Sequence, residues 1–460
     1  MSNTALLFIA VFLGGIIAAL FFSGSAAFML YQLVYMLNPD SRWWSAGIPG
    51  LRYSFITVIL MMIALAMRYK DCTEKAPWAQ QPMFKWLLLF LAMHYVMYFF
   101  ALNLTVHKQW SFEFTKVVVI VLIAYKLVTS ERALQAALWT YIIGATYVGT
   151  VARSVGRNSQ GRVEGIGMID TGGDSNHTAA ALVPAVVMLI YFAWMGNKKI
   201  KLLCVICGAF IANGLVLINS RGAFLGAVAG AGFFIFYMLF SRFQKAGQRF
   251  MAIFIIIAGL GGGLYLADDT FWERMSTLQA DEATGEVGGS GRMAFWWATF
   301  GMLRDYPMGL GVGGFPMLSE FYVDASTTTY TTSGRVPHSS WFQVLGDLGW
   351  PGPFLFGAIL FSLYRLSRNT KLYLLEQGRT DAYFQMLSLE AALLSYMVAA
   401  TFIDRIRAEM FYWLFLFIAV AGNVYYLQHV QSGKAQPEAT NRKKRSKKAT
   451  GLKHKEGRYT

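Results

Sequence analysis

The chain has 460 residues, of which 56% are hydrophobic and only 14% are charged, and its formal net charge is +15. Soluble globular domains carry about a quarter charged residues, so this composition excludes an ordinary soluble enzyme. The long apolar runs instead indicate helices that satisfy their own backbone hydrogen bonds in lipid. The cysteines are few (Cys72, Cys204 and Cys207), which excludes a disulfide framework.

Apolar runs predict an all-α polytopic membrane protein with about 12 to 13 transmembrane helices. The first run has no basic segment before it and further spans follow, so we expect no cleaved signal peptide. The second run is short, and the first two form either two spans or one broken element. The predicted helices cover residues 5–22, 25–37, 51–68, 84–103, 114–129, 133–152, 176–195, 200–219, 222–240, 250–267, 351–366, 386–404 and 408–427.

Small residues recur at four-residue spacing in the run at 222–240, at Gly222, Gly226 and Gly230. Small side chains let the backbones of two membrane helices approach closely. We therefore predict that a neighbouring helix packs against this stripe, and we assign the stripe no chemical role.

Lysine and arginine positions predict which side of the membrane each loop faces, because cytoplasmic loops are enriched in these residues. Basic clusters lie at 70–75, 198–201, 242–249 and 365–379 and in the C-terminal tail, so these segments are predicted to be cytoplasmic. Alternation of the spans then assigns the following segments to the opposite, periplasmic side: 38–50, 104–113, 153–175, 219–222, 268–350 and 405–407.

This topology predicts four parts. Residues 1–267 form an N-terminal transmembrane bundle, 268–350 a large periplasmic loop with interfacial helices, 351–431 the C-terminal transmembrane helices, and 432–460 a cytoplasmic tail. The tail carries ten Lys or Arg residues and two Glu, a net charge of +8, and is too polar to fold alone. It is typical of a disordered segment attracted to anionic lipid headgroups. No aromatic platform is interleaved with its lysines, so we expect no nucleic-acid partner.

The loop at 268–350 is the only segment outside the spans that is long enough to form a domain. Asp268 and Asp269 open it. Adjacent carboxylates could ligate a cation, but at a helix start we expect them to cap a short helix. An apolar, Trp-rich run from Arg292 to Asp305 predicts a helix lying along the membrane interface, stopped by Pro307. A glycine-rich turn at 307–315 follows, and it is not a phosphate-binding P-loop because no Lys-Ser/Thr comes after the glycines.

Three basic side chains stand at helix edges on the predicted periplasmic side: Arg221, Arg292 and His338. Arginine suits bidentate phosphate binding, and a neutral histidine can accept a hydroxyl proton. Together they indicate a site for a lipid-linked phosphate or pyrophosphate beside a general base. The alternative is that the arginines only reach headgroup phosphates and that His338 is an ordinary loop residue. Segment 38–50 offers a single acid, Asp40, so we expect no metal and no other cofactor.

Several runs resemble the O-antigen ligase and polysaccharide polymerase superfamily. The resemblance covers roughly 160–363 and is carried by residues 217–223 (LINSRGA), 290–297 (SGRMAFWW), 309–315 (GLGVGGF) and 338–349 (HSSWFQVLGDLG), with Gly161-Arg162 and Asp174-Ser175-Asn176 ahead of a span. Residues 33–39 (LVYMLNP) and 272–277 (WERMST) look similar to the exosortase-associated O-glycosylation ligase branch.

The resemblance implies a glycosyltransferase type-C-like fold in which Arg221 and Arg292 bind pyrophosphate and His338 activates the acceptor. It further implies substrate contacts from Arg162 and Asn176, and we add Arg274 and Arg335 because they break the charge bias on the same side. The sequence departs from the family pattern at Ser339, where the family commonly has Asn, and at Asp347, where it has Glu. Both differences concern how the acceptor is positioned.

The implied activity is transfer of a glycan from undecaprenyl pyrophosphate to an acceptor hydroxyl on the periplasmic face of a bacterial inner membrane. The acceptor is lipid A core, a protein or another sugar. A polymerase that extends the lipid-linked glycan is the nearest alternative, because it uses the same residues with a different acceptor. A transporter would place ionisable groups near the midplane, and a scaffold has no need of convergent Arg and His residues.

Overall fold

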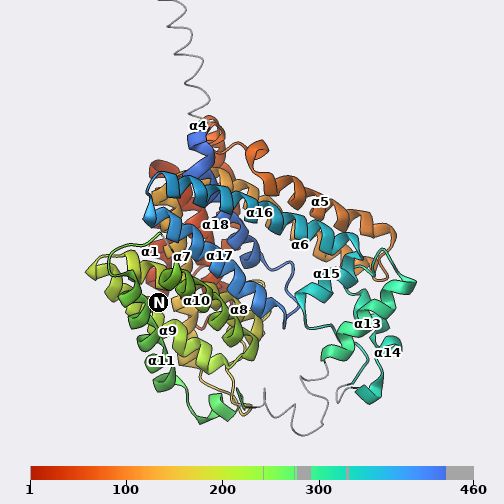
Figure 1. The fold of residues 1–460 in the computed structure, drawn as a ribbon. Helices are drawn as coiled ribbons and strands as arrows, with labels where there is room; N and C mark the ends of the chain where they lie inside the picture. Colours follow the sequence, from red (N-terminus) through yellow and green to blue (C-terminus); the bar gives the residue numbers. More distant parts are fainter. Residues whose placement is uncertain (1, 242, 274, 277–291, 328–330, 431–460) are drawn as a thin grey trace, which may run out of the picture.

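The computed structural model describes residues 2–241, 243–273, 275–276, 292–327 and 331–430 (Figure 1). Within these ranges the secondary structure is helical and contains no strand. The predicted all-α polytopic membrane fold is therefore confirmed. The tail at 432–460, most of the acidic linker after Met275, and Arg274 lie outside the described residues.

Every predicted apolar run falls on a helix. Among the described helices, eight are long and apolar enough to cross a membrane: those at Asn3–Phe22, Pro82–Phe99, Ser175–Met195, Lys198–Ile218, Arg221–Phe240, Gln248–Leu266, Thr380–Ala400 and Glu409–Val430. The helices of the bundle are α1 (Asn3–Ile17), α2 (Ser25–Leu37), α3 (Tyr53–Met67), α5 (Pro82–Val96), α6 (Leu104–Leu127), α7 (Glu131–Val155), α8 (Ser175–Met195), α9 (Lys198–Ile218), α10 (Arg221–Phe240), α11 (Gln248–Leu266), α16 (Pro351–Glu376), α17 (Thr380–Ala400) and α18 (Glu409–Gly422).

Several of these helices are longer than the apolar runs that predicted them, most clearly α6 and α16. Helix α6 begins at Leu104 and not at 114, because the side chain of Asn103 caps it by accepting a hydrogen bond from the Val106 amide. Helix α16 continues to Glu376 and not to 366. Polar turns carry no hydropathy signal, so their helical state could not be read from apolar runs alone.

The first two runs form separate helices. The helical conformation breaks at Ser23, which is extended, and α2 begins at Ser25. A Cβ atom added at Gly15 of α1 would contact Leu30 of α2. The two helices therefore pack against each other as a hairpin rather than forming one continuous element.

Helices α8, α17 and α18 form the core of the bundle, because most of each span is buried inside the protein. Helix α10 packs along α17 and α8. A Cβ atom added at Gly226 would collide with the Ser395 carbonyl oxygen, and one at Gly230 would lie 2.8 Å from the Ala391 carbonyl oxygen. The predicted close helix approach at the glycine stripe is thus confirmed, with α17 as the partner helix.

We expect Gly226→Ala to destabilise the protein in detergent by about 1–3 kcal/mol, because the added methyl group forces α10 away from the α17 backbone. Gly232→Ala is the matched control, since nothing lies within 4 Å of a Cβ atom at this position of the same helix. Thermal unfolding of the purified variants measures the difference. Equal melting temperatures for the two variants would show that the helices separate without cost.

The segments predicted to be periplasmic gather at one end of the bundle. The amide of Val163 donates to the Leu217 carbonyl (3.2 Å), and the side chain of Asn219 donates to the Thr270 carbonyl (3.2 Å). Residues 163, 217–219 and 270, far apart in sequence, thus lie side by side. The loop before α8, the corner between α9 and α10 and the start of segment 268–350 therefore lie together.

Segments predicted to be cytoplasmic gather at the opposite end. Arg379 pairs with Glu131 (3.1 Å), and the side-chain amide of Asn423 donates to the Lys75 carbonyl (3.1 Å). Two of the connections predicted to be cytoplasmic thus lie against the ends of other helices, and the side of the membrane that they face stays a prediction.

Residues 292–350 form α13 (Arg292–Asp305), α14 (Gly314–Tyr322) and α15 (Ser340–Leu348), which lie beyond the ends of α5 and α6 (Figure 1). Val344 and Leu348 of α15 belong to the main bundle core. Helices α13 and α14 share a small, separate apolar core made of Phe295, Ala298, Met302, Leu310, Phe315 and Val323. The predicted boundaries of the helix at 292–305 agree with α13.

The glycine-rich turn before α14 is packed and not flexible. The Leu310 amide donates to the Gly346 carbonyl (2.8 Å), and the Leu102 amide donates to the Leu310 carbonyl (2.9 Å). Gly311 has a φ of +71°, a backbone conformation that glycine adopts without strain. The turn therefore ties α15 to the connection between α5 and α6. Helix α14 was not predicted, since a nine-residue helix carries too few turns for a periodic signal.

Candidate active site

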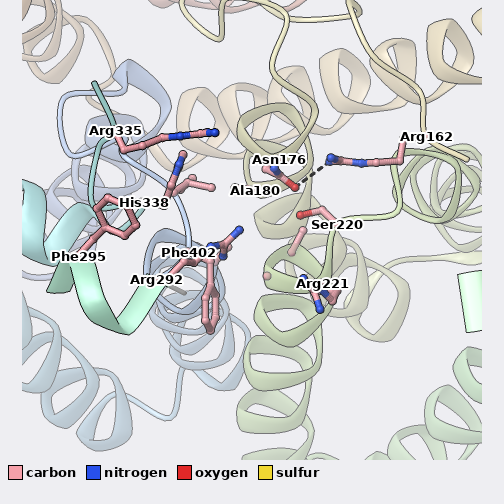
Figure 2. A pocket seen from close by; sticks show the side chains of 14 residues that line it. Arg162, Asn176, Ala180, Ser220, Arg221, Arg292, Phe295, Arg335, His338 and Phe402 are labelled. Atoms are coloured by element: carbon pink, nitrogen blue, oxygen red, sulfur yellow. Dashed lines mark hydrogen bonds between the residues drawn. The ribbon is translucent and has the colours of Figure 1, made fainter. Parts of the chain in front are cut away.

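Six of the residues predicted from sequence line one cavity of about 260 Å³ at the predicted periplasmic end. They are Arg162, Asn176, Arg221, Arg292, Arg335 and His338 (Figure 2). The seventh candidate, Arg274, lies outside the described residues. Among the described residues that line the cavity there are four arginines and no Asp or Glu. This lining favours an anionic ligand.

The cavity has two facing sides. Arg162, Asn176, Ser220 and Arg221 lie on the side formed by α8, α10 and the loop before α8, whereas Arg335, His338 and Phe295 lie on the side formed by α13 and the segment before α15 (Figure 2). We call the first the α8–α10 wall and the second the α13–α15 wall. Arg292 and Phe402 lie between the two walls (Figure 2).

Arg221 is held by the tight corner between α9 and α10. Asn219 ends α9 in a left-handed conformation (φ +57°), and its side chain donates to the Thr270 carbonyl (3.2 Å). Arg221 is the first residue of α10. The amide groups of a first helical turn have no partner within the helix and favour anions. The Arg221 side chain and the start of α10 therefore both lie at this corner of the cavity.

Arg162 is held by the ends of two helices. Its Nη2 donates to Asn176 Oδ1 (2.9 Å), and its Nε donates to the Ile218 carbonyl (3.4 Å). Asp174 caps α8 by accepting hydrogen bonds from the amides of Asn176 (2.8 Å) and His177 (3.1 Å). The Arg…Asn pair seen in the sequence is thus a direct contact.

Asp268 caps the short helical segment at 269–273, as predicted. Its Oδ1 accepts a hydrogen bond from the Phe271 amide (3.0 Å), and its other oxygen pairs with Arg157. The hydrogen bond from Arg157 is the largest of the effects that hold the pKa of Asp268 below its usual value. The carboxylate therefore has a structural role that joins the loop before α8 to residues 268–273.

His338 occupies a strained backbone position directly before α15. Its φ is +49°, which non-glycine residues rarely adopt and which is found at functional sites. Its Nδ1 lies 3.3 Å from Asp404 Oδ2, and Asp404 Oδ1 accepts a hydrogen bond from the Ser339 amide (2.9 Å). Because Nδ1 faces the carboxylate, Nε2 is the ring nitrogen left to react with a substrate.

Asp404 is a site residue that the sequence analysis missed. It lies in the turn between α17 and α18, and its side chain is only 12% exposed. The available signal was weak: a lone acid at the predicted periplasmic end of an apolar run. The contact shows that this turn belongs to the α13–α15 wall.

The two positions that depart from the family pattern both lie against this turn. Ser339 contributes its amide to Asp404. Asp347 forms a buried ion pair with Arg407 (2.8 Å). Burial raises the pKa of Asp347 to about 6, although Arg407 opposes the shift. The ion pair joins α15 to the turn that carries Asp404.

Part of the chain matches a known protein family. Residues 206–357 match the family model described as O-antigen ligase, and no curated protein sequence matches the chain. The matched range contains Arg221, Arg292 and His338, whereas Arg162 and Asp404 lie outside it. The match confirms the resemblance found in the sequence at the level of the superfamily, and together with the eight candidate spans among the described helices it supports a multi-pass membrane enzyme of the ligase or polymerase type.

Proposed function

We propose that this protein transfers a glycan from undecaprenyl pyrophosphate to an acceptor hydroxyl at the periplasmic face of the bacterial inner membrane. The observation that carries the proposal is the cavity in which four arginines and one histidine converge. Pyrophosphate is the group that such a lining suits, because arginine binds phosphate oxygens in a bidentate manner. The histidine beside it supplies the proton acceptor that a hydroxyl nucleophile needs.

The reaction is a single displacement. His338 Nε2 takes the proton of the acceptor hydroxyl, while the oxygen of that hydroxyl forms a bond to the anomeric carbon. The bond from that carbon to the phosphate oxygen breaks, and its electron pair leaves with undecaprenyl pyrophosphate. Arg221 and Arg292 stabilise the charge of this leaving group, which a metal ion would otherwise do. Asp404 orients the imidazole and stabilises the imidazolium that forms.

The remaining lining residues act on the same substrates. Arg162, held by Asn176 at 2.9 Å, contacts the donor on the α8–α10 wall, and Arg335 contacts it from the α13–α15 wall. This division of the site is a hypothesis that donor binding by Arg162 and Arg335 variants tests.

The experiment that tests the activity uses purified protein, an undecaprenyl-pyrophosphate glycan, EDTA and one acceptor at a time. We expect release of undecaprenyl pyrophosphate with one class of acceptor. A product elongated on the lipid carrier indicates a polymerase, and a glycan on lipid A core or on a protein indicates a ligase. Movement of the lipid-linked glycan across a liposome without release would overturn the proposal in favour of a transporter.

We also propose that α13 lies in the membrane interface, which brings Arg292 to headgroup depth. Trp297 and Trp350 are 67% and 57% exposed. Their rings join through Phe300, with centroid distances of 5.8 Å to Trp297 and 6.3 Å to Trp350. Phe354 lies one turn after Trp350, and its ring centroid is 6.4 Å from that of Trp86 in α5. An aromatic surface therefore runs from α13 to α5, a candidate membrane span.

A nitroxide label at Trp297→Cys tests this placement in liposomes. We expect the label to collide frequently with oxygen and rarely with a water-soluble nickel chelate, because it lies among lipid headgroups and acyl chains. Asp305→Cys, at the exposed end of the same helix, is the control and should show the reverse. Equal access of the nickel chelate to both labels would place α13 in water.

A further inference from the structure

Arg405 connects the two walls of the cavity and has no role in the reaction proposed above. It directly follows Asp404 in the turn between α17 and α18. It lies outside the range matched by the family model. Its backbone contacts the α13–α15 wall, and its side chain contacts the α8–α10 wall.

The backbone of this turn is tied to the α13–α15 wall. The Arg405 amide donates to Ser340 Oγ (3.0 Å), and Ser340 Oγ donates to the Ile403 carbonyl (2.7 Å). Ser340 is the first residue of α15, two positions after His338. Asp404 meets His338 and the Ser339 amide in the same turn. Residues 403–405 are thus joined by several contacts to the segment that carries the proposed base.

The side chain of Arg405 is tied to the α8–α10 wall. Its Nε donates to His177 Nδ1 (2.8 Å), and its Nη2 donates to the Thr171 carbonyl (3.0 Å). His177 lies in the first turn of α8, next to Asn176, which accepts the hydrogen bond from Arg162. A chain of polar contacts therefore runs from Arg162 through α8 and Arg405 to His338.

The chemistry of these contacts suits a side chain that holds two segments at a fixed distance. Both acceptors of the guanidinium are uncharged, and within the described part of the chain Arg405 has no carboxylate within ion-pair distance. A planar guanidinium donates in two fixed directions, so it sets the positions of His177 and Thr171 relative to the turn. A lysine at this position could not donate in this forked geometry.

We propose that Arg405 is a positioning residue that sets the distance between the α8–α10 wall and the α13–α15 wall, and so between the donor-binding arginines and His338. The inference rests on the proposed function, in which the donor lies on one wall and the base on the other. A displacement of about 1 Å in such a site costs up to about 100-fold in rate.

The first test is kinetic, with Arg405→Met, Arg405→Lys and, as control, Arg153→Met, an exposed arginine in the last turn of α7. We expect Arg405→Met to lower kcat/KM by about 10- to 100-fold, with the pH profile of kcat unchanged because Asp404 and His338 still meet. Arg405→Lys should recover little. Activity of Arg405→Met within twofold of the wild type overturns the inference, as does a shifted pH profile.

A second measurement is independent of activity. Spin labels at Gln160→Cys and Arg304→Cys, both exposed positions on opposite sides of the cavity, report the wall-to-wall distance by double electron–electron resonance. We expect a broader or displaced distribution in Arg405→Met and in His177→Phe, no further change in the double variant, and no change in Arg153→Met. An unchanged distribution overturns the inference even if activity falls. If the wild type transfers no glycan but the distances change as expected, the proposed function fails and the positioning role stands.

Discussion

Replacing His338 with alanine is expected to lower glycan transfer by about 10²- to 10⁴-fold, the usual contribution of a positioned general base. Protein abundance and membrane insertion should not change, because the His338 side chain is 44% exposed and packs in no core. His429→Ala is the matched control, since this exposed histidine lies beyond α18. Release of undecaprenyl pyrophosphate by purified protein measures the effect. If His338→Ala released undecaprenyl pyrophosphate at the wild-type rate, His338 would not be the general base.

The same mechanism predicts the behaviour of Asp404→Asn. The amide oxygen can still accept from the Ser339 amide, so the turn keeps its shape, but the charge beside His338 Nδ1 is lost. The imidazolium that forms on proton transfer is then less stable, and we expect a fall in kcat with little change in the KM for donor. A double variant with His338→Ala should be no slower than His338→Ala alone, because residues that act as a unit are not additive.

Removal of the Arg292 guanidinium is expected to slow transfer by about 3–4 kcal/mol, or roughly 10²- to 10³-fold, the cost of losing one donor to a developing charge. Arg292 is the first residue of α13 and lines the cavity, whereas Arg304 is exposed in the last turn of the same helix. Arg304→Ala is therefore a control of identical chemistry. Arg221→Ala should lower the rate to a similar extent.

Lysine substitutions separate charge from geometry. Arg292→Lys keeps the positive charge but cannot hold a phosphate in a bidentate manner, so we expect partial activity with weakened donor binding. Full activity would mean that charge alone suffices. If Arg292→Ala and Arg304→Ala lose the same small amount of activity, Arg292 contacts lipid headgroups and not the substrate.

The sequence by itself determined the membrane helices of this protein. A lipid environment forces about 20 apolar residues into each span, so hydropathy located α8, α9 and α10 without any tertiary information. The stripe at Gly226 and Gly230 was equally readable, because a helix places residues four apart on one face. Arg221, Arg292 and His338 stood out because they lie at helix edges on the predicted periplasmic side, where basic residues are less common.

Only the tertiary structure decided which polar groups meet. Asp404 and His338 are separated in the chain by helices α15, α16 and α17, and nothing periodic links them. Likewise, the contact from Arg405 to His177 depends on the packing of α8 against α17. Hydropathy and periodicity predict where a single helix lies and which of its faces is packed. A site, in contrast, is formed by segments that the packing of several helices brings together.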